Sequence, residues 1–333
     1  MAEPAPVHGG TDAGPEPRWD FSTNANALGP CPAVLRAVQA ADLSRYPDPR
    51  YTSLRAVLAA HHATAPDRIA VGAGASELIL RLVRAVPGPV LVLGPTFSEY
   101  ARCAGMEGRA VVEAHSPAEF LDLQRRQGGL GFLCWPNNPT GTVWPADFVA
   151  AAAERGRLVV DLAYAPLCHE KTIDAAAAAG AVHLHAPNKA FCLTGLRAAY
   201  AVVPAGWPAL EALAPSWVIG PAGVAFLAAI VTDAAQSWLA ECRPVLAAWR
   251  RALAEGVAAC GPEVQESPVP FLLARVGDAG AVTRRLRAQG LRVRDATSFG
   301  LPDWIRLAAA PPVWRDALLA ALPAALAGAE GGR

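Results

Sequence analysis

One lysine and one arginine lie eight residues apart in the segment HAPNKAFCLTGLR, residues 185–197. The chain is poor in lysine, and this lysine follows an expected strand and precedes a glycine-containing turn. A lysine amine held in a pocket can react with an aldehyde, and a guanidinium nearby can bind an anion. Lys189 and Arg197 are therefore candidates for covalent chemistry on a negatively charged ligand.

Three other segments place polar or small residues where expected strands end. GAGASE (72–77) joins a strand to a helix, and such a turn can present backbone N–H groups and a serine hydroxyl to an anion. PNNPTG (136–141) follows a hydrophobic strand, and VVDLAY (159–164) completes another. Ligands of open α/β sheets bind at the carboxyl ends of parallel strands, so we expect these segments to surround one site.

The chemical groups in these segments match the needs of pyridoxal phosphate. This cofactor needs an amine for its aldehyde, a carboxylate for its ring nitrogen, hydrogen-bond partners at its phenolic oxygen, and an anion site for its phosphate. In that order, the candidates are Lys189; Asp161; Asn138 with Tyr164; and Gly74, Ala75 and Ser76 with Arg197. Phe97, in PTFSEY (95–100), could stack on the cofactor ring. Each residue alone has an ordinary structural explanation, but their joint occurrence favours a cofactor site.

The elements expected around this site alternate between strands and helices, which is typical of an α/β domain. Continuous hydrophobic runs, such as those in 89–95 and 156–164, predict a parallel sheet that is covered on both faces. After about residue 235, a long helix candidate and several strands predict a second unit of α+β type. We therefore expect three parts: an N-terminal arm at 1–30, a large cofactor-binding domain at 31–234, and a smaller C-terminal domain at 235–333.

The composition excludes several classes of partner. The formal net charge is zero and no run of Lys or Arg stands out, which argues against binding to nucleic acid or to an anionic membrane surface. Apolar runs such as 220–231 fall short of the roughly 18–20 residues that span a bilayer, and we expect no signal peptide. Seven scattered cysteines without a C-x-x-C pair fit reduced thiols in a cytoplasmic protein and indicate no zinc site.

The sequence resembles the fold-type I pyridoxal-phosphate enzymes of the aspartate aminotransferase superfamily. The motifs that carry this resemblance are PNNPTG, the segment DLAY that begins at Asp161, and Lys189 with the downstream GLR. Within the superfamily, the chain is most similar to the branch that contains threonine-phosphate decarboxylase and histidinol-phosphate aminotransferase. The resemblance implies an aspartate-aminotransferase-like fold with Lys189 bonded to the cofactor and Asp161 paired with the pyridine nitrogen.

The resemblance also implies how the rest of the cofactor is held. Asn138 and Tyr164 would flank the phenolic oxygen, and Arg197 with the Ala75–Ser76 turn would hold the phosphate. Members of the family are usually homodimers with shared active sites. Tyr46, in RYPDP, matches a tyrosine that reaches the cofactor phosphate of the partner subunit.

The N-terminal arm favours one reaction over another. HGG (8–10) and DFSTNANALG (20–29) resemble segments of the decarboxylase. This implies decarboxylation of L-threonine O-3-phosphate to (R)-1-amino-2-propanol phosphate in cobalamin biosynthesis. The substrate ligands that carry over are His8, Asn24, Asn138, Arg294 and Arg306. Arginine forks with amide and histidine donors suit a substrate that has a phosphate and a carboxylate.

Several residues depart from the family pattern: Ala186 replaces a frequent serine or threonine, and His185 replaces a usual arginine. Tyr164, Ala27 and Ala310 differ from the decarboxylase at three further positions. A histidinol-phosphate-type aminotransferase is therefore the alternative function. A scaffold that keeps the fold without catalysis, and metal binding through the histidine pairs at 61–62 and 183–185, are further hypotheses. No third metal ligand is evident in the sequence.

Overall fold

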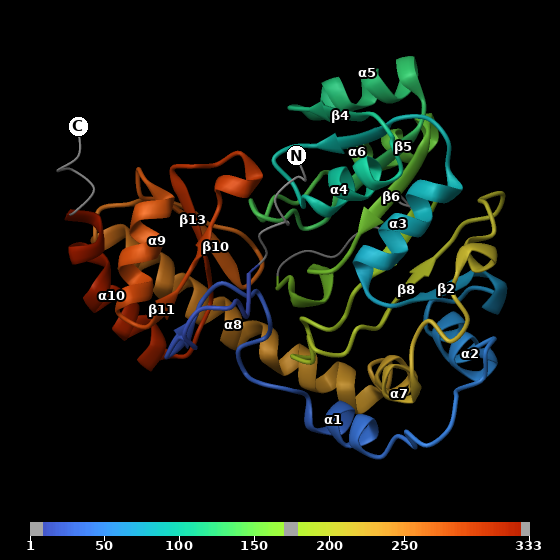
Figure 1. Ribbon diagram of the computed structural model, residues 1–333, viewed down its shortest axis with the longest axis horizontal. Helices are drawn as coiled ribbons and strands as arrows, with labels where there is room; N and C mark the ends of the chain where they lie inside the picture. Colours follow the sequence, from blue (N-terminus) through green and yellow to red (C-terminus); the bar gives the residue numbers. More distant parts are fainter. Residues whose placement is uncertain (1–8, 170–178, 328–333) are drawn as a thin grey trace.

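The computed structural model describes residues 9–169 and 179–327 of the chain. These residues form a large and a small sheet, each packed against helices, with a two-stranded pair beside the small sheet (Figure 1). The strands of the large sheet are β2 (Ile69–Gly72), β3 (Val90–Leu93), β4 (Val111–Ala114), β5 (Leu130–Cys134), β6 (Arg157–Asp161), β7 (Val182–His185) and β8 (Ala199–Val202).

The large sheet has the strand order β2-β8-β7-β6-β5-β3-β4. The pairs from β4 through β7 are parallel, whereas β8 is antiparallel to both β7 and β2. Among the described strands of this sheet, β8 alone is therefore reversed. The expected α/β architecture with a mostly parallel sheet is confirmed.

Helices cover both faces of the large sheet. Successive residues of a strand point to opposite faces, so one strand contributes to two hydrophobic clusters. On β3, Val90 and Val92 belong to one hydrophobic cluster and Leu91 and Leu93 to another. The first cluster includes residues of α1 (Pro32–Gln39), α2 (Thr52–His61), α3 (Ala75–Ala85), α4 (Glu99–Met106) and α7 (Pro221–Ala229). The second includes residues of α5 (Pro117–Gln127) and α6 (Ala146–Arg155).

The small sheet is antiparallel, with the order β12-β13-β10-β9. Its core also contains residues of three helices. The elements of this part are α8 (Asp233–Ala259), β9 (Glu263–Gln265), β10 (Phe271–Arg275), α9 (Ala279–Ala288), β11 (Leu291–Arg292), β12 (Arg294–Asp295), β13 (Trp304–Ala308) and α10 (Pro312–Ala327). The strand expected at 290–296 is divided: β11 pairs with the arm strand β1 (Trp19–Asp20), and β12 pairs with β13.

The long helix α8 contributes buried residues to both large hydrophobic clusters. Leu239 and Leu246 lie in the core beside the large sheet, and Leu253 and Val257 lie in the core of the small one. Among the described residues, no single helix is long and apolar enough to cross a membrane. The bent pair α7 and α8 meets that criterion only when the two helices are taken together.

Candidate active site

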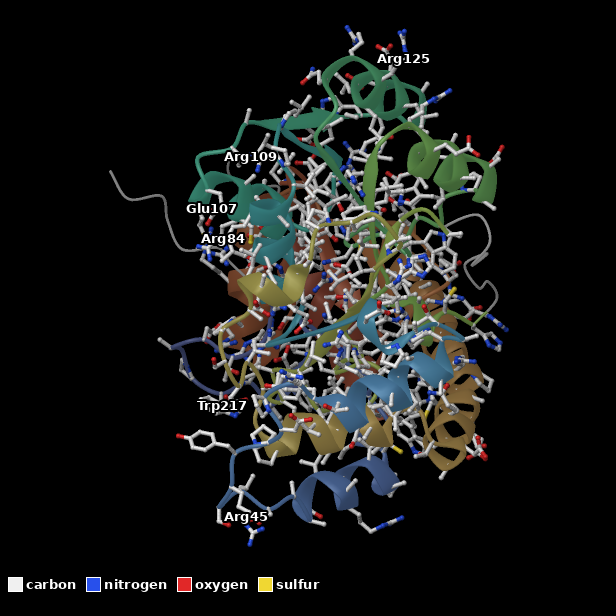
Figure 2. All side chains as sticks on the ribbon, turned by 90° about the vertical axis from the view of Figure 1, so that its right-hand side faces the viewer. Arg45, Arg84, Glu107, Arg109, Arg125 and Trp217 are labelled. Carbon is white, nitrogen blue, oxygen red and sulfur yellow. The ribbon has the colours of Figure 1, made fainter. Side chains whose placement is uncertain are left out.

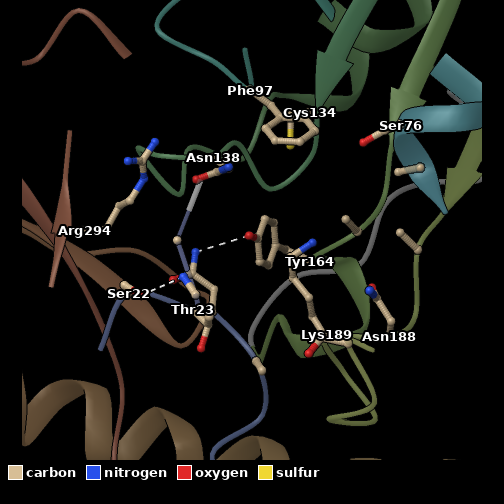
Figure 3. Close-up of a pocket in the computed structure, with 18 of the residues that line it drawn as sticks. Ser22, Thr23, Ser76, Phe97, Cys134, Asn138, Tyr164, Asn188, Lys189 and Arg294 are labelled. Carbon is tan, nitrogen blue, oxygen red and sulfur yellow. Dashed lines mark hydrogen bonds between the residues drawn. The ribbon is translucent and has the colours of Figure 1, made fainter. Parts of the chain in front are cut away.

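A cavity of about 430 Å³ lies where the carboxyl ends of the parallel strands face the small sheet and the arm. Figure 3 shows Ser76 and Arg294 on opposite sides of this cavity, with Tyr164 between them. Loops after β3, β5, β6 and β7 supply Phe97, Asn138, Tyr164 and Lys189. The parallel sheet thus brings together residues that lie far apart in sequence, as expected for this type of fold.

Lys189 lies in the turn after β7, and its Nζ is 5.0 Å from the centre of the Tyr164 ring. The Tyr164 hydroxyl accepts a hydrogen bond of 3.3 Å from Nδ2 of Asn24, which belongs to the arm. Ala186 is buried in the wall of the same cavity. The lysine amine therefore lies beside a phenol that the N-terminal arm orients.

Asp161 ends β6 and is buried at the base of the cavity. Tyr100 donates a hydrogen bond of 2.8 Å to its Oδ2, and the backbone N–H of Ala163 donates one of 3.0 Å to its Oδ1. Burial raises the pKa of the Asp161 carboxyl, whereas these two donors and the charge of Lys189 lower it. A cationic ring nitrogen would supply the partner that a buried carboxylate requires.

The turn before α3 is shaped to accept an arginine side chain. Gly74 has a φ of 91°, and a Cβ atom there would lie 2.8 Å from Nη2 of Arg197. Glycine is therefore needed both for the backbone conformation and for the approach of the guanidinium. Ala75 and Ser76 open the helix, where N–H groups without helical partners favour an anion.

The two asparagines of PNNPTG have different tasks. The Asn137 side chain accepts a hydrogen bond from the hydroxyl of Thr96 and donates to Pro95 and Thr140, which fixes the loop. Asn138 lines the cavity, and its Oδ1 accepts a hydrogen bond from Arg306. The first asparagine thus builds the loop that positions the second.

Two buried arginines from the small sheet enter the cavity. Arg294 and Arg306 are register partners on β12 and β13, and both guanidinium groups lie near the ring of Phe299. Arg294 donates a hydrogen bond of 2.6 Å to Ser298. Burial and the neighbouring Arg306 lower the pKa of Arg294 to about 10, and burial lowers that of Arg306. An anion between them would offset their desolvation and mutual repulsion.

Several buried polar atoms in this cavity have no hydrogen-bond partner among the described residues. They are Oδ1 of Asn24, Oδ1 of Asn188 and Nε of Arg306. Buried polar groups are normally satisfied, so these atoms indicate space for a polar ligand. With the open turn at Gly74 and the buried carboxylate of Asp161, they fit pyridoxal phosphate together with a charged substrate.

Most of the site residues predicted from the sequence line this one cavity. They are Ala75, Ser76, Phe97, Asn138, Asp161, Tyr164, Lys189, Arg197, Asn24, Arg294 and Arg306. Gly74 lies directly beneath Arg197, and Tyr46 is 80% exposed on the outer surface. His8 lies outside the described residues.

The sequence analysis missed Tyr100 as a partner of Asp161, although PTFSEY contains it. It also missed the cavity-lining residues Ser22, Cys134 and Asn188. A tyrosine in the first turn of a helix that follows a strand end was the available indication for Tyr100. Nothing in its local pattern, however, shows that it contacts a residue 61 positions away.

The histidines considered as metal ligands lie together next to the site. The ring of His62 is 4.7 Å from that of His185, which stacks on Tyr200. His183 and His185 have ring centres 6.4 Å apart. Within the described parts of the chain, no group of three or more potential ligands is arranged to hold a metal ion. Burial lowers the pKa of both His62 and His185, so these two packed rings favour the neutral form.

We expect His62→Gln to make the protein less sensitive to acid. Burial, followed by the charges of His61 and His183, lowers the pKa of His62 from 6.5 to about 4. Because the folded state disfavours the protonated ring, this group's contribution to stability is present above pH 6.5 and is lost as the pH falls toward 4. The wild type should lose about 2 kcal/mol more unfolding free energy than the variant between pH 7 and pH 4.5.

Urea unfolding at the two pH values measures this difference. The exposed His115, between β4 and α5 and outside this cluster, provides the control variant, His115→Gln, which should lose as much unfolding free energy as the wild type. If the wild type and His62→Gln lost the same unfolding free energy between the two pH values, His62 would not be the source of the acid sensitivity.

Comparison with known proteins places this geometry in a family. The family model for aminotransferase class I and II matches residues 17–321. The histidinol-phosphate aminotransferase of Ruegeria pomeroyi is 31% identical over 309 residues, which cover 86% of this chain and 85% of the relative.

Two solved structures are similar over most of their length. Histidinol-phosphate aminotransferase from Sinorhizobium meliloti, in complex with pyridoxal 5'-phosphate, has a TM-score of 0.84 at 26% identity and covers 94% of this chain and 92% of its own. L-threonine-O-3-phosphate decarboxylase from Porphyromonas gingivalis has a TM-score of 0.81 at 22% identity. The match covers 92% of this chain and 99% of the decarboxylase, and it shows a shared fold. From the family match and the cavity together, the chain belongs to the class I and II aminotransferases, which are pyridoxal-phosphate enzymes of fold type I.

Proposed function

We propose that this protein is a pyridoxal-phosphate-dependent aminotransferase that acts on a small phosphorylated amino substrate of the histidinol-phosphate kind. The observation that carries the proposal is the pair of buried arginines, Arg294 and Arg306, in the same cavity as Lys189. Relatives at about one-third identity are histidinol-phosphate aminotransferases. These relatives support the aminotransferase reaction better than the decarboxylase reaction, which the HGG and DFSTNANALG segments of the arm favoured.

The cofactor supplies an electron sink for the bonds at the substrate carbon that bears the amine. Lys189 would hold it covalently, and its amine would move a proton at that carbon. Asp161, oriented by the Tyr100 hydroxyl and the backbone N–H of Ala163, would keep the ring nitrogen protonated. Lys189 and Asp161 therefore carry the chemical roles in our proposal.

The remaining residues bind and orient the cofactor. Its phosphate is bound by Gly74, Ala75, Ser76 and Arg197 at one end of the cavity. Asn138 and Tyr164 hydrogen-bond the phenolic oxygen, and Phe97 packs on the ring face. The ring would then lie between the anion-binding turn and the small sheet.

The substrate is bound at the other end of the cavity. Arg294 and Arg306 hold its negatively charged groups, with Asn24 and Asn138 as hydrogen-bonding partners. Because both guanidinium groups are buried and fixed by stacking on Phe299, they select for charge and for distance from the lysine. A substrate without a phosphate would lack the charged hydrogen bonds that these two guanidinium groups can donate.

Decarboxylation of threonine phosphate is the second candidate. A specific observation favours it, because Gly9 and Gly10 of the HGG segment and Asn24 of the DFSTNANALG segment line the cavity. These are the arm motifs that resemble the decarboxylase. The two reactions differ in which bond at the substrate carbon is broken, and therefore in how the arginines orient the carboxylate.

A product assay separates the two reactions. The holoenzyme is given histidinol phosphate with 2-oxoglutarate, and separately L-threonine O-3-phosphate alone. We expect glutamate to form in the first reaction and no CO2 in the second. Release of CO2 with aminopropanol phosphate would establish the decarboxylase instead. An apoprotein that shows no cofactor absorbance after incubation with pyridoxal phosphate would support the scaffold hypothesis.

We also propose that the active unit is a homodimer with shared sites. The ring centres of Tyr46 and Trp217 lie 4.7 Å apart on the outer surface, and both rings are exposed. Figure 2 shows Trp217 and the neighbouring Arg45 at one margin of the molecule. Exposed aromatic residues at one place are typical of an interface, and Tyr46 would extend from it to the partner's cofactor phosphate.

A complementation experiment tests whether Tyr46 acts on the partner's site. Tyr46→Ala should weaken cofactor binding about tenfold through the lost hydrogen bond. When this variant is mixed with Lys189→Ala and the subunits exchange, half the dimers are mixed and each has one intact site. At a cofactor concentration that loads the wild type but leaves Tyr46→Ala largely empty, the activity of the mixture should then rise to about a quarter of the wild-type value. No gain in activity after demonstrated subunit exchange would exclude a shared site.

A further inference from the structure

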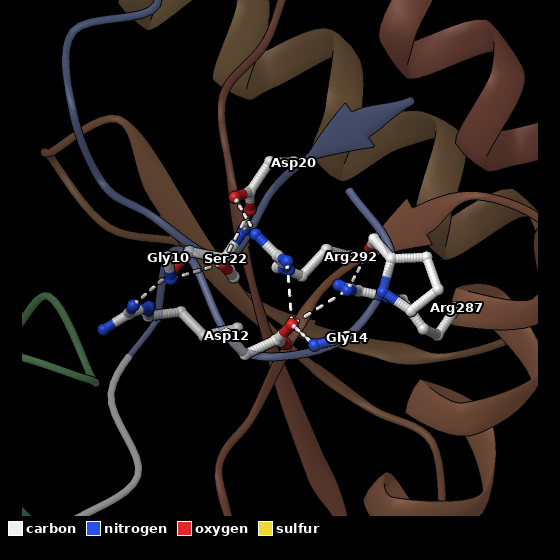
Figure 4. A network of polar contacts seen from close by, with 9 residues as sticks. Gly10, Asp12, Gly14, Asp20, Ser22, Arg287 and Arg292 are labelled. Atoms are coloured by element: carbon white, nitrogen blue, oxygen red, sulfur yellow. Dashed lines mark hydrogen bonds and ion pairs between the residues drawn. The ribbon is translucent and has the colours of Figure 1, made fainter. Parts of the chain in front are cut away.

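A network of carboxylates and arginines holds the N-terminal arm against α9 and β11 (Figure 4). Oδ1 of Asp12 lies 2.9 Å from Nη2 of Arg287 and 3.1 Å from Nη2 of Arg292. The same oxygen accepts a hydrogen bond of 2.9 Å from the backbone N–H of Gly14. One exposed carboxylate therefore joins the arm to α9 and to β11.

The network continues from Arg292 back into the arm. Arg292 is buried, and its Nη1 lies 3.1 Å from Oδ2 of Asp20. Oδ1 of Asp20 accepts hydrogen bonds of 2.8 Å and 2.6 Å from the backbone N–H and the hydroxyl of Ser22. The Ser22 hydroxyl accepts a hydrogen bond of 2.9 Å from the N–H of Gly10. Arg292 thus lies between two carboxylates of the arm, one on each side of a bend.

Both ends of this network reach the substrate cavity. Gly10 and Ser22 line it, and the Ser22 carbonyl accepts a hydrogen bond of 2.9 Å from Nη2 of Arg306. At Gly9, a Cβ atom would lie 2.2 Å from that same carbonyl oxygen. The glycines of the arm therefore pack against the backbone that supports a substrate-binding arginine.

The two halves of the arm are held by different kinds of interaction. Trp19 and Phe21 donate backbone hydrogen bonds to Gly290 and Arg292, which continues the pairing of β1 with β11. The half that contains Gly9 and Gly10 is held by the Asp12 ion pairs and the Ser22 hydroxyl. Side-chain charge therefore decides where the cavity-lining glycines lie.

We propose that Asp12, Arg287 and Arg292 form a clasp that holds the Gly9–Gly10 segment against the substrate end of the cavity and so raises affinity for the substrate. The proposal rests on the function proposed above, because it assumes that this end binds substrate. Asp12 is a positioning residue. It fixes the segment of Gly10, which bonds to Ser22, and the carbonyl of Ser22 accepts a hydrogen bond from Arg306. The chemical step, at Lys189, does not depend on it.

Steady-state kinetics of Asp12→Asn test the clasp. We expect KM for the phosphorylated substrate to rise about fivefold, with kcat within about twofold of wild type and an unchanged cofactor absorbance spectrum. Asp12→Glu keeps the charge and should restore most of the affinity, and Arg287→Gln should reproduce the defect. Asp122→Asn is the control, since Asp122 pairs with Arg125 and Arg126 on the surface of α5.

The clasp also predicts a result that needs no substrate. In hydrogen–deuterium exchange of the holoenzyme, peptides that cover residues 9–18 should exchange at least about fivefold faster in Asp12→Asn, whereas peptides from β6 and β7 should not change. Unchanged exchange in the arm, or a KM equal to wild type, would overturn the proposal. Faster exchange in an enzyme inactive on every phosphorylated substrate would instead retain the clasp and reject the proposed function.

Discussion

Lys189→Ala should reduce kcat/KM at least about a thousandfold while leaving the fold intact, because it removes both the covalent attachment and the proton carrier. The side chain is partly exposed to the cavity and lies over the ring of Tyr164, so its loss leaves no large apolar void. The absorbance band of the bound cofactor near the visible edge should disappear. Unchanged far-ultraviolet circular dichroism would show that folding is unaffected.

The rarity of lysine makes this prediction unusually direct to check. The chain has two lysines, and the other, Lys171, lies outside the described residues. Borohydride reduction of the holoenzyme should attach the cofactor mass to the peptide that contains Lys189. Lys171→Ala should keep both the label and the activity. A label that persists in Lys189→Ala would reject the assignment.

Arg306→Gln should raise KM for the phosphorylated substrate about a hundredfold, which is the scale for losing one partner of a buried charged hydrogen bond. Arg306 bonds to Asn138 and to the carbonyl of Ser22, so its substitution also loosens the contact between PNNPTG and the arm. The affinity for an analogue without a phosphate should change much less. Steady-state kinetics with the paired substrates measure this selectivity.

Arg275 offers a matched control on the neighbouring strand. Its side chain is 54% exposed and lies near Glu263 and Asp303 on the outer surface. Arg275→Gln removes the same charge from the same sheet and should leave KM unchanged. If both variants raised KM equally, the effect of Arg306 would be general electrostatics and not binding in the cavity.

The cofactor residues could be predicted because each follows the end of a strand. Asp161 ends β6, while Asn138 and Lys189 lie in loops at the same edge of the parallel sheet, and hydrophobic runs identify those strands well. The same reasoning cannot find Tyr100, whose partner is set by how α4 packs on the sheet. It also cannot find the contact between His62 and His185, which requires α2 to pack near the turn after β7.

The substrate residues were predicted from resemblance and not from periodicity. Arg294 and Arg306 lie on short strands where an arginine could equally face the solvent, as Arg275 does. Their pairing across β12 and β13, and the stacking on Phe299, depend on tertiary packing. The clasp was not predicted, because Asp12 and Arg287 are ordinary surface charges until the arm folds back on α9.

The reversal of β8 determines how this chain can tolerate mutation. β7 and β8 are antiparallel neighbours with His185 opposite Tyr200, so Lys189 and Arg197 share one return of the chain. An insertion there cannot be absorbed by sliding β8, because a shift of one residue would exchange the side chains that point to the two faces of the sheet. At Gly195, in contrast, a Cβ atom would meet no neighbour within 4 Å. A substitution at Gly195 is therefore cheap, whereas a change in the length of the return would alter the distance between the amine and the guanidinium.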